Sequence, residues 1–121
     1  MMNIKKGEIY LANLGNRKDY DIGKIRPVLV FQNNLLNMMI ERTAFRDVIV
    51  IPLSSKIRKN QFTYKIKSRD NLEKDSVLLC NSIKMINADR LLLDKPILTT
   101  LTDNEITEVE KILYLLFDCR V

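Results

Sequence analysis

A series of short apolar runs, rich in β-branched residues and separated by polar breaks, most limits how this chain can fold. The runs lie at residues 8–14, 28–32, 48–55, 62–67, 76–80 and 83–87. Runs of this length with alternating or continuous apolar character are typical of strands. Alternation in the first run predicts a strand with one face exposed to water. Pro52 inside the run 48–55 predicts an edge, a bulge or a bend there.

The sequence from Thr102 onward predicts a C-terminal helix. Thr102 and Glu105 have the spacing of a capping box. Apolar residues follow at helical intervals and form one stripe: Ile106, Val109, Ile112, Leu113 and Leu116. The segment 35–45 is compatible with either a short helix or an irregular crossover. Several short strands followed by one helix predict a mainly β fold, with a small, strongly bent sheet or barrel and a helix packed across it.

Length and apolar composition predict a single globular domain over residues 1–121. A chain with 46% apolar residues can bury one core, whereas two domains of this total length would each be too small.

Twenty Lys and Arg against fifteen Asp and Glu give a net charge of +5, which favours acidic partners such as RNA, DNA or an anionic protein segment. We find no apolar run of transmembrane length and no apolar signal core, so we expect a cytoplasmic protein without membrane association.

The residue types available exclude several kinds of catalysis. Histidine is absent, and the two cysteines, Cys80 and Cys119, do not have the spacing of metal ligands. This excludes zinc sites and nucleophilic catalysis of the Ser-His or Cys-His type. We therefore expect no metal and no other cofactor, and an enzyme of this composition has to work without imidazole.

Arg26 is the most unusual charged residue in the sequence, because it directly precedes a proline and a buried run. Pro27 favours an extended backbone at Arg26 and removes one ladder donor, so we expect the strand to start at Val28 with the guanidinium at its mouth. The polar segment 15–24, which contains two glycines, predicts a loop leading to Arg26. Taken by itself, the arginine is better explained by an ordinary surface ion pair, for instance with Asp21.

A hydroxyl pair and a basic loop follow the run 48–55. Ser54 and Ser55 end the run, and Lys56, Arg58 and Lys59 come directly after them. Hydroxyls and cations of this kind can bind the phosphates of a nucleic acid. A strand-end turn and a solvated loop are the ordinary interpretations of the same residues. Among the aromatic residues, Tyr20 is the best candidate for base stacking, because it lies in a polar segment.

The chain resembles the MazF/PemK endoribonuclease toxins over nearly its whole length. The resembling motifs, in chain order, are Gly7-Glu8-Ile9-Tyr10, Arg26-Pro27-Val28-Leu29-Val30, Ile51-Pro52-Leu53-Ser54, Asp75-Ser76-Val77-Leu78-Leu79, Ile83-Lys84 and Leu101-Thr102-Asp103-Asn104-Glu105. Each motif alone is a weak signal, whereas their common order and spacing are fairly specific. The resemblance implies an SH3-like barrel with added helices, the fold that this family shares with the CcdB toxins.

The resemblance also implies a function and a set of site residues. The family cleaves single-stranded RNA without a metal, leaving 2′,3′-cyclic phosphate and 5′-hydroxyl ends, and is inhibited by a cognate antitoxin. By position, Arg26 and Ser54 correspond to the family's catalytic arginine and threonine, and Asp21 to an acidic residue that supports them. Ser82 stands where the family often has a glutamine, at a position that affects the RNA sequence preference. A homodimer is implied as well, and the identity of the general base is left open.

Two other functions remain compatible with the sequence. The apolar C-terminal segment 114–121 resembles the region through which CcdB-like toxins poison DNA gyrase. A catalytically weakened binding homologue is the other alternative, because Ser54 replaces a threonine. The threonine-to-serine change keeps the hydroxyl and loses a methyl group together with some rotamer restriction. The Arg-Pro strand and the hydroxyl at position 54 favour the nuclease.

Overall fold

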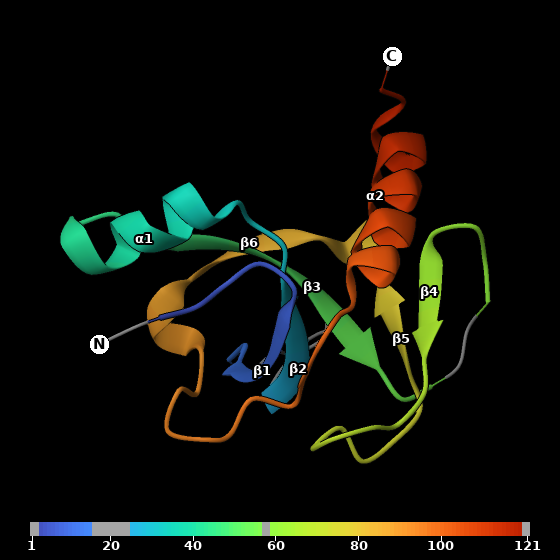
Figure 1. The fold of residues 1–121 in the computed structure, drawn as a ribbon, viewed down its shortest axis with the longest axis horizontal. Helices are drawn as coiled ribbons and strands as arrows, with labels where there is room; N and C mark the ends of the chain where they lie inside the picture. The colour runs from blue at the N-terminus through green and yellow to red at the C-terminus, as the bar shows by residue number, and fades with distance from the viewer. Residues whose placement is uncertain (1–2, 16–24, 57–58, 120–121) are drawn as a thin grey trace.

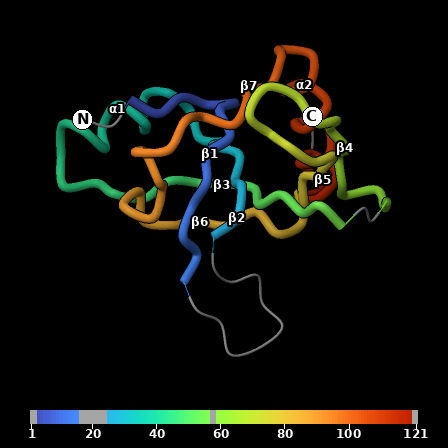
Figure 2. Tube along the Cα trace, turned by 90° about the horizontal axis from the view of Figure 1, so that it is seen from below, coloured from blue at the N-terminus to red at the C-terminus, as the bar shows by residue number. Residues whose placement is uncertain are grey.

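A computed structural model describes residues 3–15, 25–56 and 59–119. The elements within these ranges are β1 Glu8–Asn13, β2 Ile25–Val30, α1 Asn34–Arg42, β3 Asp47–Ser54, β4 Thr63–Ile66, β5 Ser76–Leu79, η1 Cys80–Ser82, β6 Lys84–Asn87, η2 Ala88–Arg90, β7 Thr99–Thr100 and α2 Asp103–Phe117. The strands form a bent antiparallel sheet in the order β4-β5-β3-β2-β1-β7, and β6 pairs with β3 beside this path. The two helices lie toward opposite ends of the sheet (Figures 1 and 2). The predicted fold class, mainly β with a C-terminal helix, is confirmed.

Apolar side chains cover both faces of the sheet. Ile9 belongs to a cluster that includes Val109 of α2, whereas its neighbour Tyr10 belongs to a second cluster that includes Ile40 of α1. Successive side chains of a strand point to opposite faces, so β1 contributes to both clusters. The prediction of a water-exposed face for this strand is therefore wrong, and Tyr10 is only 9% exposed.

β2 begins earlier than the sequence predicted, so Arg26 lies inside the strand. In the pairing with β1, Arg26 is opposite Ala12 and Pro27 is opposite Leu11. Pairing with β3 begins only at Val28. Pro27 thus precedes the part of β2 that is paired on both edges, where a proline would remove a ladder hydrogen bond. The expected start at Val28 holds for only one edge of the strand.

β3 changes partner along its length, close to the proline for which the sequence predicted an edge, a bulge or a bend. Its first half pairs with β6 up to Val50, and its end pairs with β5 through Leu53 and Ser54. Pro52 lies in the gap between these two pairings, so it interrupts neither of them. This change of partner carries Ser54 to a position between β2 and β5.

The segment 35–45, whose structure the sequence left open, is mostly α1. Asn33 caps this helix by accepting a hydrogen bond from the Leu36 amide at 2.9 Å. The buried side chains of Gln32 and Asn37 hydrogen-bond to each other at 3.2 Å, and Gln32 also accepts from the Ile49 amide at 3.2 Å. These bonds join the end of β2, α1 and β3 into one polar network.

α2 begins with the predicted capping box. The Thr102 hydroxyl accepts from the Glu105 amide at 3.2 Å, and the Glu105 carboxylate accepts from the Thr102 amide at 2.9 Å. The helix packs closely on Gly7, where a Cβ atom would lie 3.1 Å from Cδ1 of Ile106. Gly7 also has φ +96°, a conformation that side chains disfavour. Glycine at this position therefore allows both the turn before β1 and the approach of α2.

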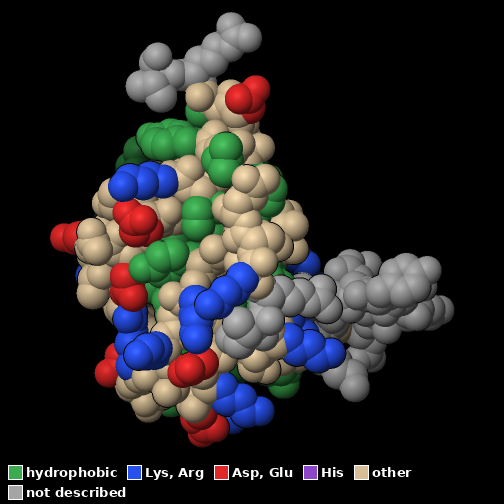
Figure 3. All heavy atoms as spheres, turned by 90° about the vertical axis from the view of Figure 1, so that its right-hand side faces the viewer, with side chains coloured by type: hydrophobic (Ala, Val, Ile, Leu, Met, Phe, Trp, Pro, Cys, Tyr) green, Lys and Arg blue, Asp and Glu red, His purple; other side chains and the backbone are tan. Residues whose placement is uncertain are grey.

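The last turns of α2 present apolar side chains to the surface. Tyr114, Leu115 and Phe117 are 56%, 55% and 58% exposed. Apolar side chains gather on this side of the molecule, above a region where acidic and basic side chains mix (Figure 3). The end of α2 thus has an exposed apolar surface.

Arg69 connects the segment between β4 and β5 to the start of α2. Its guanidinium donates to both carboxylate oxygens of Glu105, at 2.8 and 2.7 Å, and to the Thr99 hydroxyl at 3.1 Å. Hydrogen bonding from Arg69 is the main cause that lowers the pKa of Glu105. The Glu105 side chain is only 16% exposed, so the pair is partly shielded from solvent.

We expect Glu105→Gln to lower the free energy of unfolding at pH 7 by about 1.5–3 kcal/mol, because it removes a charged hydrogen-bond acceptor from Arg69. A carboxyl whose pKa is lowered in the folded state stabilises the fold above its unfolded pKa of about 4.3 and loses this effect as the pH falls through the folded value. Urea unfolding at pH 7 and at pH 3 measures both. Glu108→Gln is the control, since the exposed pair of Glu108 with Lys111 is expected to contribute less than about 1 kcal/mol. An equal loss for Glu105→Gln at both pH values would contradict the assignment.

Candidate active site

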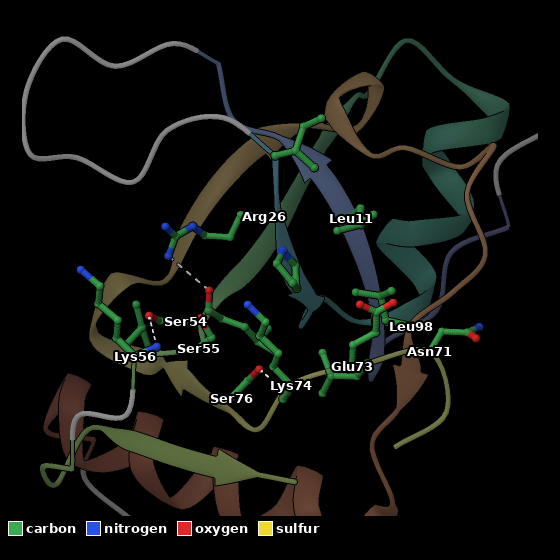
Figure 4. Close-up of a pocket in the computed structure, with 15 residues that line it drawn as sticks. Leu11, Arg26, Ser54, Ser55, Lys56, Asn71, Glu73, Lys74, Ser76 and Leu98 are labelled. Atoms are coloured by element: carbon green, nitrogen blue, oxygen red, sulfur yellow. Dashed lines mark hydrogen bonds between the residues drawn. The ribbon is translucent and has the colours of Figure 1, made fainter. Parts of the chain in front are cut away.

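Arg26 and Ser54 line the same cavity, whose volume is about 690 Å³ (Figure 4). The register of β2 and β3 sets Val28 opposite Pro52. The pairing ends there, and Arg26 and Ser54 each lie two residues beyond it, Arg26 toward the start of β2 and Ser54 at the end of β3. Residues opposite each other on antiparallel strands have side chains on the same face. Strand register therefore brings together two residues that are far apart in the sequence.

The Arg26 guanidinium lies at the wall of this cavity and keeps most of its donors available. Its Nη1 donates to the backbone carbonyl of Leu53 at 3.3 Å. Within the described ranges this is its only hydrogen bond, and no carboxylate there forms an ion pair with it. Partial burial lowers the pKa of Arg26 from its usual range. Asp21, the ion-pair partner considered from the sequence, lies outside the described residues.

Ser54 is held by a turn at the end of β3. Its Oγ accepts a hydrogen bond from the Lys56 amide at 3.1 Å, as in a common strand-end turn. A hydroxyl that accepts in this way still has its own hydrogen to donate. The turn therefore fixes the oxygen of Ser54 at the cavity while leaving a donor for a ligand. Lys56 lines the same cavity.

The other predicted site residues are not all found at this cavity. Lys59 is exposed and Ser82 lies on η1, and neither is among the described residues that line the cavity. Tyr20 and Arg58 lie outside the described residues. Of the RNA-binding residues predicted from the sequence, the structure thus places Lys56 beside Arg26 and Ser54.

Sequence reasoning missed the opposite wall of the cavity, which the segment between β4 and β5 supplies. Asn71, Glu73 and Lys74 of this segment all line the cavity (Figure 4). The pairing of Ser54 with Val77 of β5 brings this segment to the end of β3. The only available signal was that Lys74 directly precedes the Asp75-Ser76 motif, and nothing in the spacing indicated that this segment would face Arg26.

The cavity combines hydroxyl groups with a positive charge. Three cationic side chains and one carboxylate line it, together with three serines: Arg26, Lys56, Lys74, Glu73, Ser54, Ser55 and Ser76. A concave surface with excess positive charge attracts anions such as phosphates. Among residues 3–15, 25–56 and 59–119, no group of three or more His, Cys, Asp or Glu side chains is placed to hold a metal ion. None of the helices in this part of the chain has the length and apolar character needed to cross a membrane.

Comparison with known proteins identifies the class to which this fold and site belong. Residues 5–117 match the family described as PemK-like, MazF-like toxin of type II toxin-antitoxin system. The endoribonuclease MazF of Staphylococcus saprophyticus is 33% identical over 109 residues, which cover 88% of this chain and 84% of that protein. The chain belongs to this family of PemK-like, MazF-like toxins. The predicted family and enzyme class, an endoribonuclease toxin, are confirmed.

Solved structures of low sequence identity share the fold. A mycobacterial endoribonuclease in complex with its cognate antitoxin has a TM-score of 0.73 at 18% identity, covering 98% of this chain and 99% of that one. The Mycobacterium tuberculosis toxin MazF-mt6 has a TM-score of 0.73 at 18% identity, covering 94% and 99%. A MazE-MazF structure from Deinococcus radiodurans has a TM-score of 0.74 at 16% identity, covering 97% of both chains. These similarities confirm the predicted barrel-type fold.

Proposed function

We propose that this chain is a metal-independent, sequence-selective endoribonuclease that cleaves single-stranded RNA. The ribose 2′-hydroxyl attacks the adjacent phosphorus, so that a 2′-oxygen–phosphorus bond forms and the bond to the 5′-oxygen breaks. The products are a 2′,3′-cyclic phosphate and a 5′-hydroxyl. The observation that supports this function most directly is the position of Arg26 and Ser54 on the wall of one cationic cavity.

Arg26 stabilises the negative charge that develops on the phosphoryl oxygens during this attack. A guanidinium offers a planar set of donors that matches two oxygens of a phosphate. The partly buried position of Arg26 strengthens this interaction, because charges interact more strongly away from bulk water. Arg26 has no carboxylate partner in the described part of the chain, so its charge is available to the substrate. This is electrostatic stabilisation of the kind that an oxyanion hole supplies.

Ser54 lies on β3, next to the strand that carries Arg26, and donates its hydroxyl hydrogen to a phosphoryl oxygen of the RNA. Its hydrogen bond from the Lys56 amide holds the oxygen in place before the substrate binds. The side chains of Lys56 and Lys74 bind the neighbouring phosphates of the RNA strand. Each of these residues acts through charge or hydrogen bonding, and the 2′-hydroxyl of the RNA supplies the nucleophile.

The proposal also covers the organisation and the partners of the chain. The 121 residues act as one domain in the cytoplasm. A cognate antitoxin inhibits the enzyme by binding at the cavity. An acidic antitoxin segment fits the cavity, because it would meet the cations that otherwise bind RNA phosphates. The exposed apolar side chains at the end of α2 support a homodimer, because a second copy of the chain would cover them or a surface next to them. Known relatives named as endoribonucleases favour this function over gyrase poisoning.

Incubation of the purified protein with a long single-stranded RNA in EDTA is expected to give discrete fragments. Their 5′ ends should accept phosphate from a polynucleotide kinase without prior phosphatase treatment, and their 3′ ends should be cyclic phosphates by mass spectrometry. Cleavage without divalent ions is expected because charge stabilisation comes from protein side chains.

Three results would contradict the proposal. One is RNA that stays intact in EDTA and is cut when Mg²⁺ is added. Another is a product with 5′-phosphate ends, which the attack of the 2′-hydroxyl cannot give. The third is intact RNA together with inhibition of purified DNA gyrase, which would favour the CcdB-like alternative.

A further inference from the structure

The cavity that holds Arg26 continues into a second, smaller cavity of about 340 Å³. Residues common to both cavities form the junction between them: Leu11, Asn71, Glu73 and Leu98. The second cavity is completed by Asp70, Lys95 and Pro96. In the close-up, Glu73 lies beside Leu98 and Leu11, on the side of the first cavity away from Ser54 and Lys56 (Figure 4). The cavity thus has a cationic hydroxyl side and a carboxylate side with apolar walls.

Glu73 brings a carboxylate without an ion-pair partner, as far as the described part of the chain shows, to the junction. Its side chain is exposed, and within the described residues no hydrogen bond or ion pair involves it. A carboxylate repels phosphate, so Glu73 disfavours an RNA phosphate directly beside it, although Lys95 also lines the second cavity. A ligand that fits here needs hydrogen-bond donors and an apolar body, and a nucleobase has both.

Asn71 adds a second acceptor at the junction. Its Nδ2 donates to the carbonyl of Ile97 at 2.9 Å, and its backbone amide donates to the carbonyl of Leu98 at 2.9 Å. These two bonds fix the segment and leave the Oδ1 of Asn71 as an unused acceptor among the described residues. Two neighbouring acceptors match a base that carries an exocyclic amino group, as adenine, cytosine and guanine do. Uracil, in contrast, has carbonyl oxygens and a single imino donor on its pairing edge.

We propose that Glu73 determines RNA sequence specificity by accepting a hydrogen bond from the exocyclic amino group of a base next to the scissile phosphate. The base lies between Leu11 and Leu98 at the junction, while its phosphate lies toward Arg26 and Ser54. The inference builds on the proposed nuclease function and adds to it the class of base that the site selects. A hydrogen-bond match of this kind discriminates between bases by roughly tenfold to a hundredfold.

Oligonucleotides with a single ribose in a DNA chain test this inference, because only that position has the 2′-hydroxyl needed for cleavage. We would vary the base of the ribonucleotide and the base that follows it, which lie on the two sides of the scissile phosphate, and measure kcat/KM for each combination. The wild-type protein is expected to favour an amino-bearing base over uracil by at least about tenfold at one of the two positions. Glu73→Gln is expected to lose most of this preference, since its amide also donates to the carbonyl oxygens of uracil.

The controls separate specificity from general damage. Glu41→Gln removes an exposed carboxylate from α1, away from the cavity, and is expected to keep the wild-type preference. Glu73→Ala should lower the preference as Glu73→Gln does, without favouring uracil. An unchanged base preference in Glu73→Gln, or a wild-type preference for uracil on both sides, would overturn this inference alone. Absence of cleavage by the wild-type protein of both these oligonucleotides and long RNA would overturn the proposed nuclease as well.

Discussion

Arg26→Ala is expected to reduce kcat/KM for RNA cleavage by at least about a hundredfold. Loss of one preorganised donor to a developing oxyanion typically costs about 3 kcal/mol of transition-state stabilisation. Arg26 contributes a full charge as well as donors, and no other described arginine lines the cavity. The loss should appear in kcat more than in KM, because the charge on the phosphoryl group grows toward the transition state. Single-turnover cleavage of a labelled oligonucleotide measures it.

Two further variants show whether the charge or its geometry matters. Arg26→Lys keeps the charge and loses the planar fork, so we expect it to recover only part of the activity. Arg42→Ala is the matched control, because Arg42 is an exposed arginine at the end of α1 and does not line the cavity. Thermal unfolding of each variant checks that the bond from Arg26 to the Leu53 carbonyl is not essential for folding. Undiminished cleavage by a folded Arg26→Ala would remove Arg26 from the mechanism.

The sequence allowed the strands and the capped helix to be predicted from local signals, and the Arg26–Ser54 pair to be predicted by resemblance to a family. Alternation, β-branched residues and the Thr102 capping box act over a few residues, and the structure contains the corresponding elements. The pair was found through motif order, which carries tertiary information that a single run of residues does not. The water-exposed face of β1 was predicted wrongly because Tyr10 belongs to a buried cluster whose other members, among them Ile40 of α1, are distant in the sequence.

The opposite wall of the cavity shows why the rest of the site was not predictable. Glu73 and Lys74 belong to a polar segment whose composition is that of an ordinary loop. They reach the site because β3 passes from β6 to β5 after Pro52, and β5 begins directly after this segment. A proline predicts that a strand bends or loses a partner, but it does not predict which strand becomes the next neighbour. Ser82 shows the converse, because its motif position predicted RNA binding, whereas it is not among the described residues that line the cavity.

Ser54→Ala is expected to lower kcat/KM by about tenfold to a hundredfold, because a hydrogen bond to a charged group contributes about 1.5–3 kcal/mol. Ser55→Ala is the matched control: Ser55 lines the same cavity but makes no side-chain hydrogen bond within the described residues. We expect Ser55→Ala to change the rate only slightly. A larger loss for Ser55→Ala than for Ser54→Ala would mean that Ser55, and not Ser54, supplies the catalytic hydroxyl.

Ser54→Thr decides whether the serine makes this chain a weakened member of its family. Threonine restricts the side-chain rotamer through its extra methyl group, which would help a mobile hydroxyl. The hydrogen bond from the Lys56 amide already restrains the Ser54 oxygen, so we expect Ser54→Thr to change the rate by less than about threefold. A rise of tenfold or more would mean that this restraint is insufficient and would favour the weakened-binder alternative. The double variant Arg26→Ala/Ser54→Ala should lose less than the product of the two single losses, because both residues act on one phosphate and neither keeps its full effect without the other.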